Sequence, residues 1–147
     1  MTTCVRGGMI DPIWPGCRPT KGACDEMEKK TVRLGIIGLG QRGEVMIDSP
    51  VIGMLGEGLA VTAVCDLLPD RAQAAADRLE KAGAPRPFVT TDYRAVLSRD
   101  DVDAVYVAVA WEAHVEVAVA AMRAGKPIGL EAGGAYSLDD CWQLVHT

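Results

Sequence analysis

Short apolar runs alternate along this chain with segments whose apolar residues recur at helical spacing. Several of the runs are nearly continuous in apolar character, which is typical of parallel strands that are buried on both faces of a sheet. The pattern predicts strands over 32–37, 59–65, 88–89, 102–109 and 128–130. It predicts helices over 44–47, 69–82, 92–98, 112–124 and from 137 to the C-terminus. Alternation of strand and helix favours an α/β fold, a doubly wound parallel sheet with right-handed crossovers.

Local signals mark the ends of these helices. Asp48-Ser49-Pro50 is expected to end the first helix, because proline lacks the N–H that a helix interior needs. Pro69 opens the next helix at a position that tolerates the missing N–H, and Gly83 stops that helix. Ser137, followed by Asp140, predicts a capping box at the start of the last helix.

Three glycines follow the first strand at the spacing of a dinucleotide-binding turn. They stand in the motif Gly38-Leu39-Gly40-Gln41-Arg42-Gly43, between an apolar strand and a helix. One glycine permits the sharp turn, one allows the backbone to approach a pyrophosphate, and one lets the helix pack on the strand. The free N–H groups at the start of the helix would face the phosphates. We expect every residue of this motif to bind the cofactor.

Asp66 closes the second predicted strand, roughly 20 residues beyond the motif, which is the spacing of the ribose-binding acid in such units. Its carboxylate would accept hydrogen bonds from the adenosine ribose hydroxyls. The next residue is Leu67 rather than an arginine or lysine, so no obvious cation stands beside Asp66 for the 2′-phosphate of NADP. We therefore expect NAD. The alternative is an ordinary strand–helix–strand unit with a tight turn and a helix-starting aspartate.

Charge and composition narrow the partners. The net charge of −5 comes with no basic cluster, so neither nucleic acid nor an anionic membrane surface is expected as a partner. No run of about 18 apolar residues predicts a membrane span, and no export signal is recognisable. The five cysteines lack the close paired spacing of a zinc site or a disulfide framework. We expect no metal and a location in the cytoplasm.

The chain divides into a leader and one domain. Residues 1–30 contain prolines and glycines without helical or strand periodicity, which predicts a poorly ordered leader. Met27, shortly before the first strand, is an alternative start of the protein. Residues 31–147 form the predicted domain, whose length suits one dinucleotide-binding unit and little more.

Several further motifs resemble one family of oxidoreductases. They are the glycine motif, Val64-Cys65-Asp66, Thr91-Asp92-Tyr93-Arg94, Asp101-Val102-Asp103-Ala104-Val105 and Ala124-Gly125-Lys126-Pro127. Together they are similar to the NAD-binding half of the Gfo/Idh/MocA oxidoreductases, over residues 32–147. Arg42, the stretch 107–114, Glu131 and the stretch 135–145 resemble the branch of NAD-dependent glycoside hydrolases that includes α-N-acetylgalactosaminidases.

The resemblance to this branch implies hydrolysis of a sugar linkage with no net redox change. Hydride passes from the sugar C3 carbon to NAD⁺, the neighbouring C2–H becomes acidic, and elimination, water addition and hydride return complete the reaction. The family's dehydrogenases usually carry Glu-Lys-Pro after the fifth strand, whereas this chain has Glu131-Ala132-Gly133 and lacks that lysine. The resemblance therefore favours a glycosidase, with a sugar or polyol dehydrogenase as the alternative.

The resemblance also implies three residues near the nicotinamide. His114 matches the family's histidine after the fourth strand and is expected in the cofactor pocket; a local helix-cap contact is the alternative. Trp111 would wall the nicotinamide side, or else pack between domains. Glu131 would lie near the nicotinamide ribose, with an exposed loop carboxylate as the alternative. No catalytic residue is assigned.

Members of the family are more than twice as long, because a second α/β domain supplies the sugar-binding floor and the catalytic groups. We expect this chain to stop inside the last helix of the cofactor domain, before a sixth strand and before that second domain. A sugar would then be a partner only together with the missing domain, and the fifth strand would be an exposed edge open to self-association. A non-enzymatic nucleotide-binding module is the third alternative.

Overall fold

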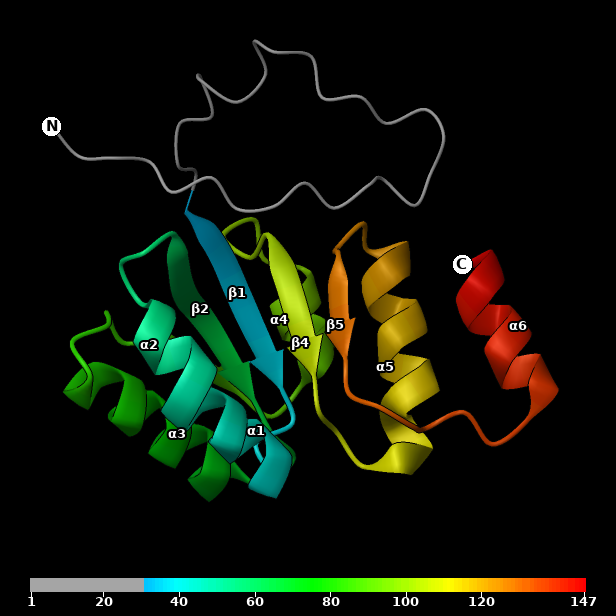
Figure 1. Ribbon diagram of the computed structural model, residues 1–147, viewed down its shortest axis with the longest axis horizontal. Coiled ribbons are helices and arrows are strands. Elements are labelled where there is room, and N and C mark those ends of the chain that lie inside the picture. The colour runs from blue at the N-terminus through cyan, green and yellow to red at the C-terminus, as the bar shows by residue number, and fades with distance from the viewer. Residues whose placement is uncertain (1–30) are drawn as a thin grey trace, which may run out of the picture.

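The computed structural model describes residues 31–147, which fold around a sheet of five parallel strands (Figure 1). The strands lie in the order β3-β2-β1-β4-β5. Their bounds are Val32–Ile37 (β1), Leu59–Cys65 (β2), Phe88–Thr90 (β3), Ala104–Val107 (β4) and Ile128–Leu130 (β5). The predicted α/β, doubly wound parallel sheet is confirmed, although β4 is shorter than the apolar run 102–109.

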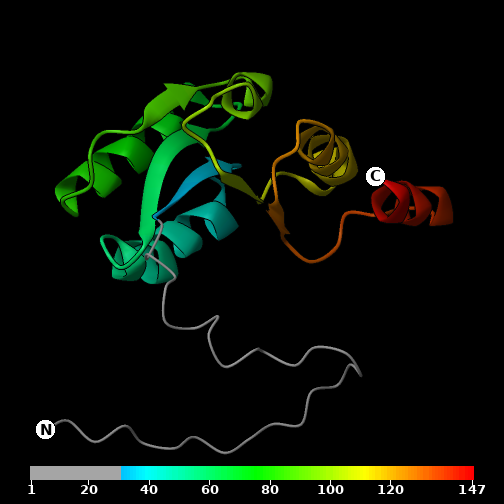
Figure 2. The ribbon, with the colours of Figure 1, turned by 90° about the horizontal axis from the view of Figure 1, so that it is seen from above.

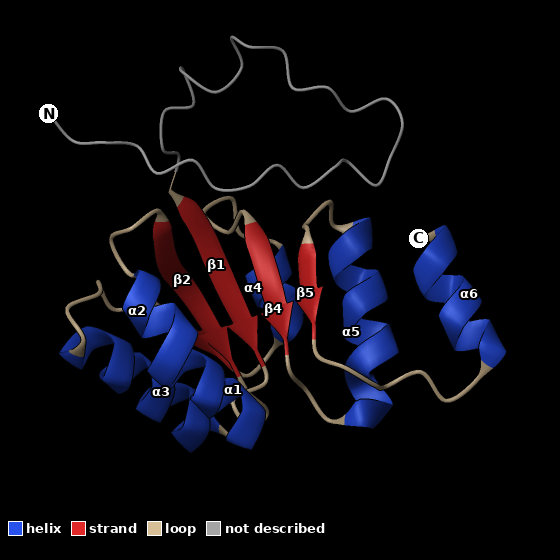
Figure 3. Ribbon diagram, viewed as in Figure 1, coloured by secondary structure: helices blue, strands red, loops and turns tan. Residues whose placement is uncertain are grey.

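Helices cover both faces of the sheet, as Figure 3 shows. The helical elements are α1 (Gln41–Met46), η1 (Ile47–Val51), α2 (Ile52–Met54), α3 (Pro69–Lys81), α4 (Tyr93–Leu97), α5 (Trp111–Arg123) and α6 (Leu138–His146). One core cluster joins the sheet to η1 and α3, and a second joins it to α4 and α5. Neighbouring residues of β1 supply both: Ile36 is buried in the first cluster and Ile37 in the second.

The first helix is longer than the sequence predicted. The expected end at Asp48-Ser49-Pro50 is wrong, because α1 continues through the π-helical turn η1 into α2. A wider π turn shifts the backbone hydrogen bonds by one residue, so it tolerates the missing N–H of Pro50 better than a regular helix does. Ile47 and Val51 are buried in the core, and their burial keeps this turn against the sheet.

The strand order reverses next to β1, and this position determines where a ligand can bind. The chain runs from β1 outward to β2 and β3, then returns to the other side of β1 for β4 and β5. In open parallel sheets, ligands bind at the carboxyl ends of the strands, in the crevice where the order reverses. The turns that follow β1, β2 and β4 all open at this edge.

The C-terminal part of the domain is built on β5, which is an edge strand of the described sheet. The predicted capping box is present at the start of α6: the N–H of Asp140 donates to Ser137 Oγ (3.0 Å), and the Asp140 carboxylate accepts from the N–H of Ser137 (3.1 Å). Figures 1 and 2 show α6 beside α5, away from the strands. None of its residues is buried.

Two expectations fall outside the described part of the chain: the poorly ordered leader over residues 1–30 and the alternative start at Met27. Within residues 31–147, no helix has both the length and the apolar character that crossing a membrane requires. The same residues contain no group of three or more His, Cys, Asp or Glu side chains that could hold a metal ion.

Candidate functional site

A cleft of about 710 Å³ opens at the carboxyl ends of β1, β2 and β4, where the strand order reverses. Its volume lies within the range of small-molecule and cofactor sites. The lining comes from the turns after these strands and after β3, and from the N-terminal parts of the helices that follow. The lining residues are Ile37, Gly38, Gly40, Gln41, Arg42, Cys65, Asp66, Leu67, Leu68, Arg71, Thr91, Tyr93, Ala108, Val109, Ala110, Ala113, Glu116 and Val117.

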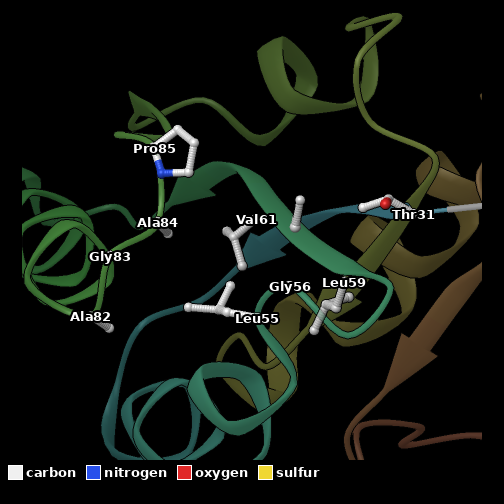
Figure 4. Close-up of a pocket in the computed structure, with 10 residues that line it drawn as sticks. Thr31, Leu55, Gly56, Leu59, Val61, Ala82, Gly83, Ala84 and Pro85 are labelled. Atoms are coloured by element: carbon white, nitrogen blue, oxygen red, sulfur yellow. The ribbon is translucent and has the colours of Figure 1, made fainter.

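A second hollow, of about 350 Å³, lies at the opposite end of the sheet (Figure 4). It is lined by residues around the start of β2, such as Leu59 and Val61, by Leu55 after α2, and by the turn 82–85 after α3. None of its lining residues is titratable. The first cleft is therefore the better candidate for a functional site, because it combines charged side chains with the expected edge of the sheet.

The fold itself requires glycine at positions 38 and 43. Gly38 has a φ of +93°, and a β-carbon there would lie 2.5 Å from the backbone carbonyl of Ala108, on the neighbouring turn after β4. A β-carbon at Gly43 would overlap the carbonyl oxygen of Gly38. These two glycines therefore allow the turn and the close packing of α1 on the end of β1, as the sequence motif predicted.

Gly40 differs from the other two glycines, because nothing in the protein requires it. Its backbone is extended, with φ −68° and ψ −170°, a conformation open to any residue. A β-carbon there would meet only the end of the Arg71 side chain, at 3.7 Å from Nη1. Gly40 faces the cleft, so a side chain at this position would occupy space that a ligand could use.

Asp66 joins two of the turns that line the cleft. One carboxylate oxygen accepts a hydrogen bond from the N–H of Leu39 (2.7 Å) and the other accepts one from the N–H of Leu68 (2.9 Å). The residue is only 8% exposed. An ionised carboxylate has about four acceptor positions, so each oxygen can still accept another hydrogen bond. Leu39 contributes its N–H here, while its side chain is buried in the core.

Arg42, Tyr106 and Glu131 form a cluster beside the glycine turn. Arg42 Nε lies 3.0 Å from Glu131 Oε1, and the Tyr106 hydroxyl donates a hydrogen bond to the same carboxylate. This hydrogen bond, together with the charge of Arg42, holds the pKa of Glu131 below its usual value. Burial, reinforced by Glu131, raises the pKa of Tyr106 to about 12. The cluster connects the start of α1 with the segment that leaves β5.

His114 and Trp111 lie at the N-terminal end of α5, outside the lining of the cleft. His114 is 2% exposed, and its Nδ1 donates to the carbonyl oxygen of Gly133 at 3.3 Å. Its Nε2 is buried and has no hydrogen-bond partner among the described residues. Trp111 is half exposed and packs beside Gly133 and the ring of Tyr136. Both side chains therefore contact the segment after β5.

The residues predicted from the sequence thus fall into two groups. Gly38, Gly40, Gln41, Arg42 and Asp66 line the cleft. Trp111, His114 and Glu131 meet around the segment 131–136, and the Arg42–Glu131 ion pair connects this second group with the cleft. Gly43 and the Leu39 side chain are buried behind the turn and shape it from within.

Sequence reasoning missed three charged or polar side chains in the cleft. Arg71 is the third residue of α3, and its position in the first turn after β2 could have indicated a side chain that lines the same cleft as Asp66. Tyr93 and Glu116 come from α4 and α5, and the Tyr93 hydroxyl donates to Glu116 Oε1 at 2.7 Å. No sequence pattern indicates this last contact, because it depends on how two helices lie across the second face of the sheet.

The fold and the cleft together define a class, the NAD-binding Rossmann domains. A family model described as "Oxidoreductase family, NAD-binding Rossmann fold" matches residues 32–147. The chain belongs to this family, the Gfo/Idh/MocA oxidoreductases, and the matched segment is its NAD-binding domain. The resemblance found in the sequence motifs is confirmed.

Among curated relatives, a glycosyl hydrolase family 109 protein of Streptomyces niveus is 46% identical over 121 residues. The match covers 80% of this chain but 24% of that protein, so the chain spans about a quarter of the relative's length.

Solved structures of larger enzymes share the fold. A myo-inositol dehydrogenase from Lactobacillus casei, in complex with NAD(H) and myo-inositol, superposes with a TM-score of 0.69 at 29% identity, covering 79% of this chain and 32% of that one. KijD10, a 3-ketoreductase from Actinomadura kijaniata in complex with NADP, gives a TM-score of 0.63 at 28% identity, covering 80% and 34%.

Proposed function

We propose that the cleft holds NAD with its pyrophosphate on the turn 38–43 and its adenosine ribose at Asp66. The observation that carries this proposal is Gly40, which leaves space in the cleft although neither its conformation nor its packing needs a glycine. The first N–H groups of the helical run that begins at Gln41 lack backbone partners within the helix, so they can donate to phosphate oxygens. The unused acceptor positions of Asp66 suit the two ribose hydroxyls.

At the other end of the cofactor, we assign Arg42 and Glu131 to the nicotinamide side. Their ion pair connects the glycine turn with the segment after β5, so it can set the position of that segment. His114 acts as a positioning residue in this proposal, because its hydrogen bond to Gly133 fixes the same segment from below. Trp111, packed beside Gly133, would form the wall on that side.

For the whole protein, we propose hydrolysis of a sugar linkage of the glycosyl hydrolase family 109 kind, which the similarity to the relative from Streptomyces niveus supports. The bound cofactor would supply reversible hydride transfer at the sugar C3 carbon. The chain's own residues would bind and orient the cofactor. We propose that residues 1–147 alone bind nucleotide without turnover, and that a sugar becomes a partner only with a further domain.

A sugar or polyol dehydrogenase is the second candidate, because the structural neighbour from Lactobacillus casei is a myo-inositol dehydrogenase. The two candidates differ in their products. A dehydrogenase accumulates NADH with a free sugar, whereas a glycosidase releases the aglycone without net NADH.

We also propose a location in the cytoplasm and self-association. The free cysteines Cys65 and Cys141 suit the reducing cytoplasm, and the edge strand β5 offers a site for self-association.

Calorimetric titration of the chain with NAD⁺ tests the cofactor proposal. We expect saturable binding by the natural chain and at least about tenfold weaker binding by Asp66→Ala, since hydrogen bonds to a charged group contribute about 1.5–3 kcal/mol. Asp139→Ala, an acidic residue of α6 away from the cleft, is the matched control and should bind normally. Absence of NAD⁺ binding by a chain shown to be folded by circular dichroism would reject the proposal.

A further inference from the structure

The Tyr106 side chain reaches from β4 to the end of the neighbouring strand β5. Tyr106 lies opposite Gly129 in the register of the two strands, and a β-carbon at Gly129 would lie 3.4 Å from Tyr106 Cδ2. The tyrosine ring therefore lies beside a position that has no side chain of its own. Glu131 comes two residues after Gly129, so its side chain is on the same face of the sheet. This arrangement lets the Tyr106 hydroxyl meet the Glu131 carboxylate.

Two side-chain donors converge on one oxygen of Glu131. The Tyr106 hydroxyl donates to Oε1, and Arg42 Nε lies 3.0 Å from the same oxygen. A carboxylate oxygen has two acceptor positions, so these donors fill Oε1. The hydrogen bond from Tyr106, together with Arg42 and the N–H of Ala132, holds the pKa of Glu131 below its usual value. Among the described residues, no side chain donates to Oε2, so this oxygen keeps an acceptor position for a ligand.

The segment that carries Glu131 is also held by α5. His114 Nδ1 donates to the carbonyl oxygen of Gly133 at 3.3 Å, and that glycine lies beside the Trp111 ring. In the described part of the chain, the titratable groups that contact this segment at Glu131 and Gly133 are thus Arg42 from α1, Tyr106 from β4 and His114 from α5. Tyr106 is the one whose donor can be removed while its ring is kept, by substitution with phenylalanine.

We propose that Tyr106 is a positioning residue for the nicotinamide end of NAD. By holding Oε1, its hydroxyl keeps Oε2 of a charged carboxylate available to the hydroxyls of the nicotinamide ribose. The inference rests on the proposed placement of that end of the cofactor at Arg42 and Glu131. Tyr106 does not line the cleft, so its contribution to binding passes through Glu131 rather than through contact with the nucleotide.

Calorimetric titration of Tyr106→Phe with NAD⁺ and with ADP tests this inference. ADP carries the adenosine and the pyrophosphate but lacks the nicotinamide ribose. The variant should lose about three- to tenfold in NAD⁺ affinity and less than about twofold in ADP affinity, since it loses the indirect effect of one hydrogen bond to a charged group. Tyr93→Phe is the matched control, because it removes the hydroxyl that donates to Glu116 at the proposed adenosine side. It should leave the ratio of the two affinities unchanged.

A double-mutant cycle shows whether Tyr106 acts through Glu131. Glu131→Gln should weaken NAD⁺ binding, and Tyr106→Phe added to it should cause no further loss. The pH dependence is a second measurement. Without the Tyr106 hydrogen bond, the pKa of Glu131 rises toward 4.5, so the ratio of NAD⁺ to ADP affinity should fall as the pH drops toward that value. The same ratio should change less in the natural chain, while the adenine ring and His114 are common to every comparison.

Additive losses in the cycle would overturn the inference, because Tyr106 would then act independently of Glu131. Equal losses of NAD⁺ and ADP affinity in Tyr106→Phe would also overturn it, because the hydroxyl would then support the whole cleft. So would an unchanged NAD⁺ affinity. If the natural chain, shown to be folded by circular dichroism, binds neither nucleotide, the proposed function itself fails.

Discussion

At the scale of single residues, the three glycines of the turn answer to different physical demands. Gly38 is set by its positive φ and by the backbone of Ala108, and Gly43 by the carbonyl oxygen of Gly38. Gly40 has an ordinary backbone conformation and faces the cleft. One motif therefore contains two glycines that the fold needs and one that, in our proposal, the ligand needs, and substitution can separate the two requirements.

Gly40→Ala should weaken NAD⁺ binding without harming the fold. Alanine fits the native backbone, so the variant should gain about 0.4–1 kcal/mol of stability by restricting the unfolded chain, yet lose at least about tenfold in NAD⁺ affinity because the methyl group enters the cleft. Gly43→Ala is the matched comparison, and its overlap with Gly38 should cost about 1–3 kcal/mol of stability. Urea denaturation and calorimetry measure both effects. A Gly40→Ala chain with unchanged affinity would show that the cleft does not hold the pyrophosphate there.

The cluster of Arg42, Tyr106 and Glu131 leads to a second prediction about single residues, which concerns how the stability of the chain depends on pH. The Tyr106 hydrogen bond holds the pKa of Glu131 below its ordinary value of 4.5. The stabilisation from this carboxylate is therefore complete above pH 4.5 and is lost as the pH falls through the lower folded pKa. At the alkaline end, the stabilisation from the Tyr106–Glu131 hydrogen bond is lost as the pH rises through the pKa of Tyr106, about 12.

Tyr106→Phe should therefore destabilise the chain most at pH values between these acidic and alkaline losses. The difference in free energy of unfolding between the variant and the natural chain should shrink in acid. Urea unfolding at a series of pH values measures it, and the Glu131 carboxyl resonance should titrate at higher pH in the variant than in the natural chain. Tyr136→Phe, at an exposed tyrosine outside this cluster, is the control. A destabilisation independent of pH would mean that Tyr106 acts through packing alone.

The site was predictable where it depends on local sequence and not where it depends on tertiary contacts. The glycine turn and Asp66 follow from spacing along two strands, and the structure places them at one cleft. Arg71 and Tyr106 were missed because each needs a neighbour that only the folded sheet supplies. That neighbour is Gly40 on the glycine turn for Arg71 and Glu131, just after the adjacent strand β5, for Tyr106. Apolar pattern alone cannot show that a tyrosine inside a strand carries a hydrogen bond.

At the scale of elements, the order of strands and helices was readable because each buried strand leaves an uninterrupted apolar run. The predicted end of the first helix was wrong because η1 accommodates Pro50, a residue type that breaks most helices. Ile47 and Val51 of η1 are buried against the sheet. Burial of these two side chains outweighed the local preference of Pro50, and local signals alone could not reveal that tertiary contribution.

The helix α6 is the element that we expect to open first. It has no buried residue, so its stability depends on the capping box and its contacts with α5 rather than on core packing. Its amides should exchange with solvent faster than those of α5, and Ser137→Ala should speed exchange in α6 while leaving α5 unchanged, since an N-cap contributes about 1 kcal/mol. Hydrogen exchange followed by mass spectrometry resolves the two helices. Equal protection of α5 and α6 would show that α6 is an integral part of the core.

At the scale of the whole molecule, we expect this chain to bind NAD⁺ without converting a sugar. General acid–base catalysis near neutral pH needs a group that can exchange a proton there. In the described part of the cleft, burial raises the pKa of the Cys65 thiol to about 12, and burial also raises the pKa of Tyr93. His114 does not line the cleft: its side chain is buried and donates a hydrogen bond to the carbonyl oxygen of Gly133.

The 147-residue chain should therefore bind NAD⁺ yet release no aglycone from an aryl glycoside and accumulate no NADH with a free sugar. The relative from Streptomyces niveus, of which this chain matches 24%, is the positive control for aglycone release in the same assay. Aglycone release or NADH formation by the 147-residue chain alone would mean that its own side chains suffice for the chemistry. Binding without either product supports a domain that positions the cofactor and depends on further residues to act on a sugar.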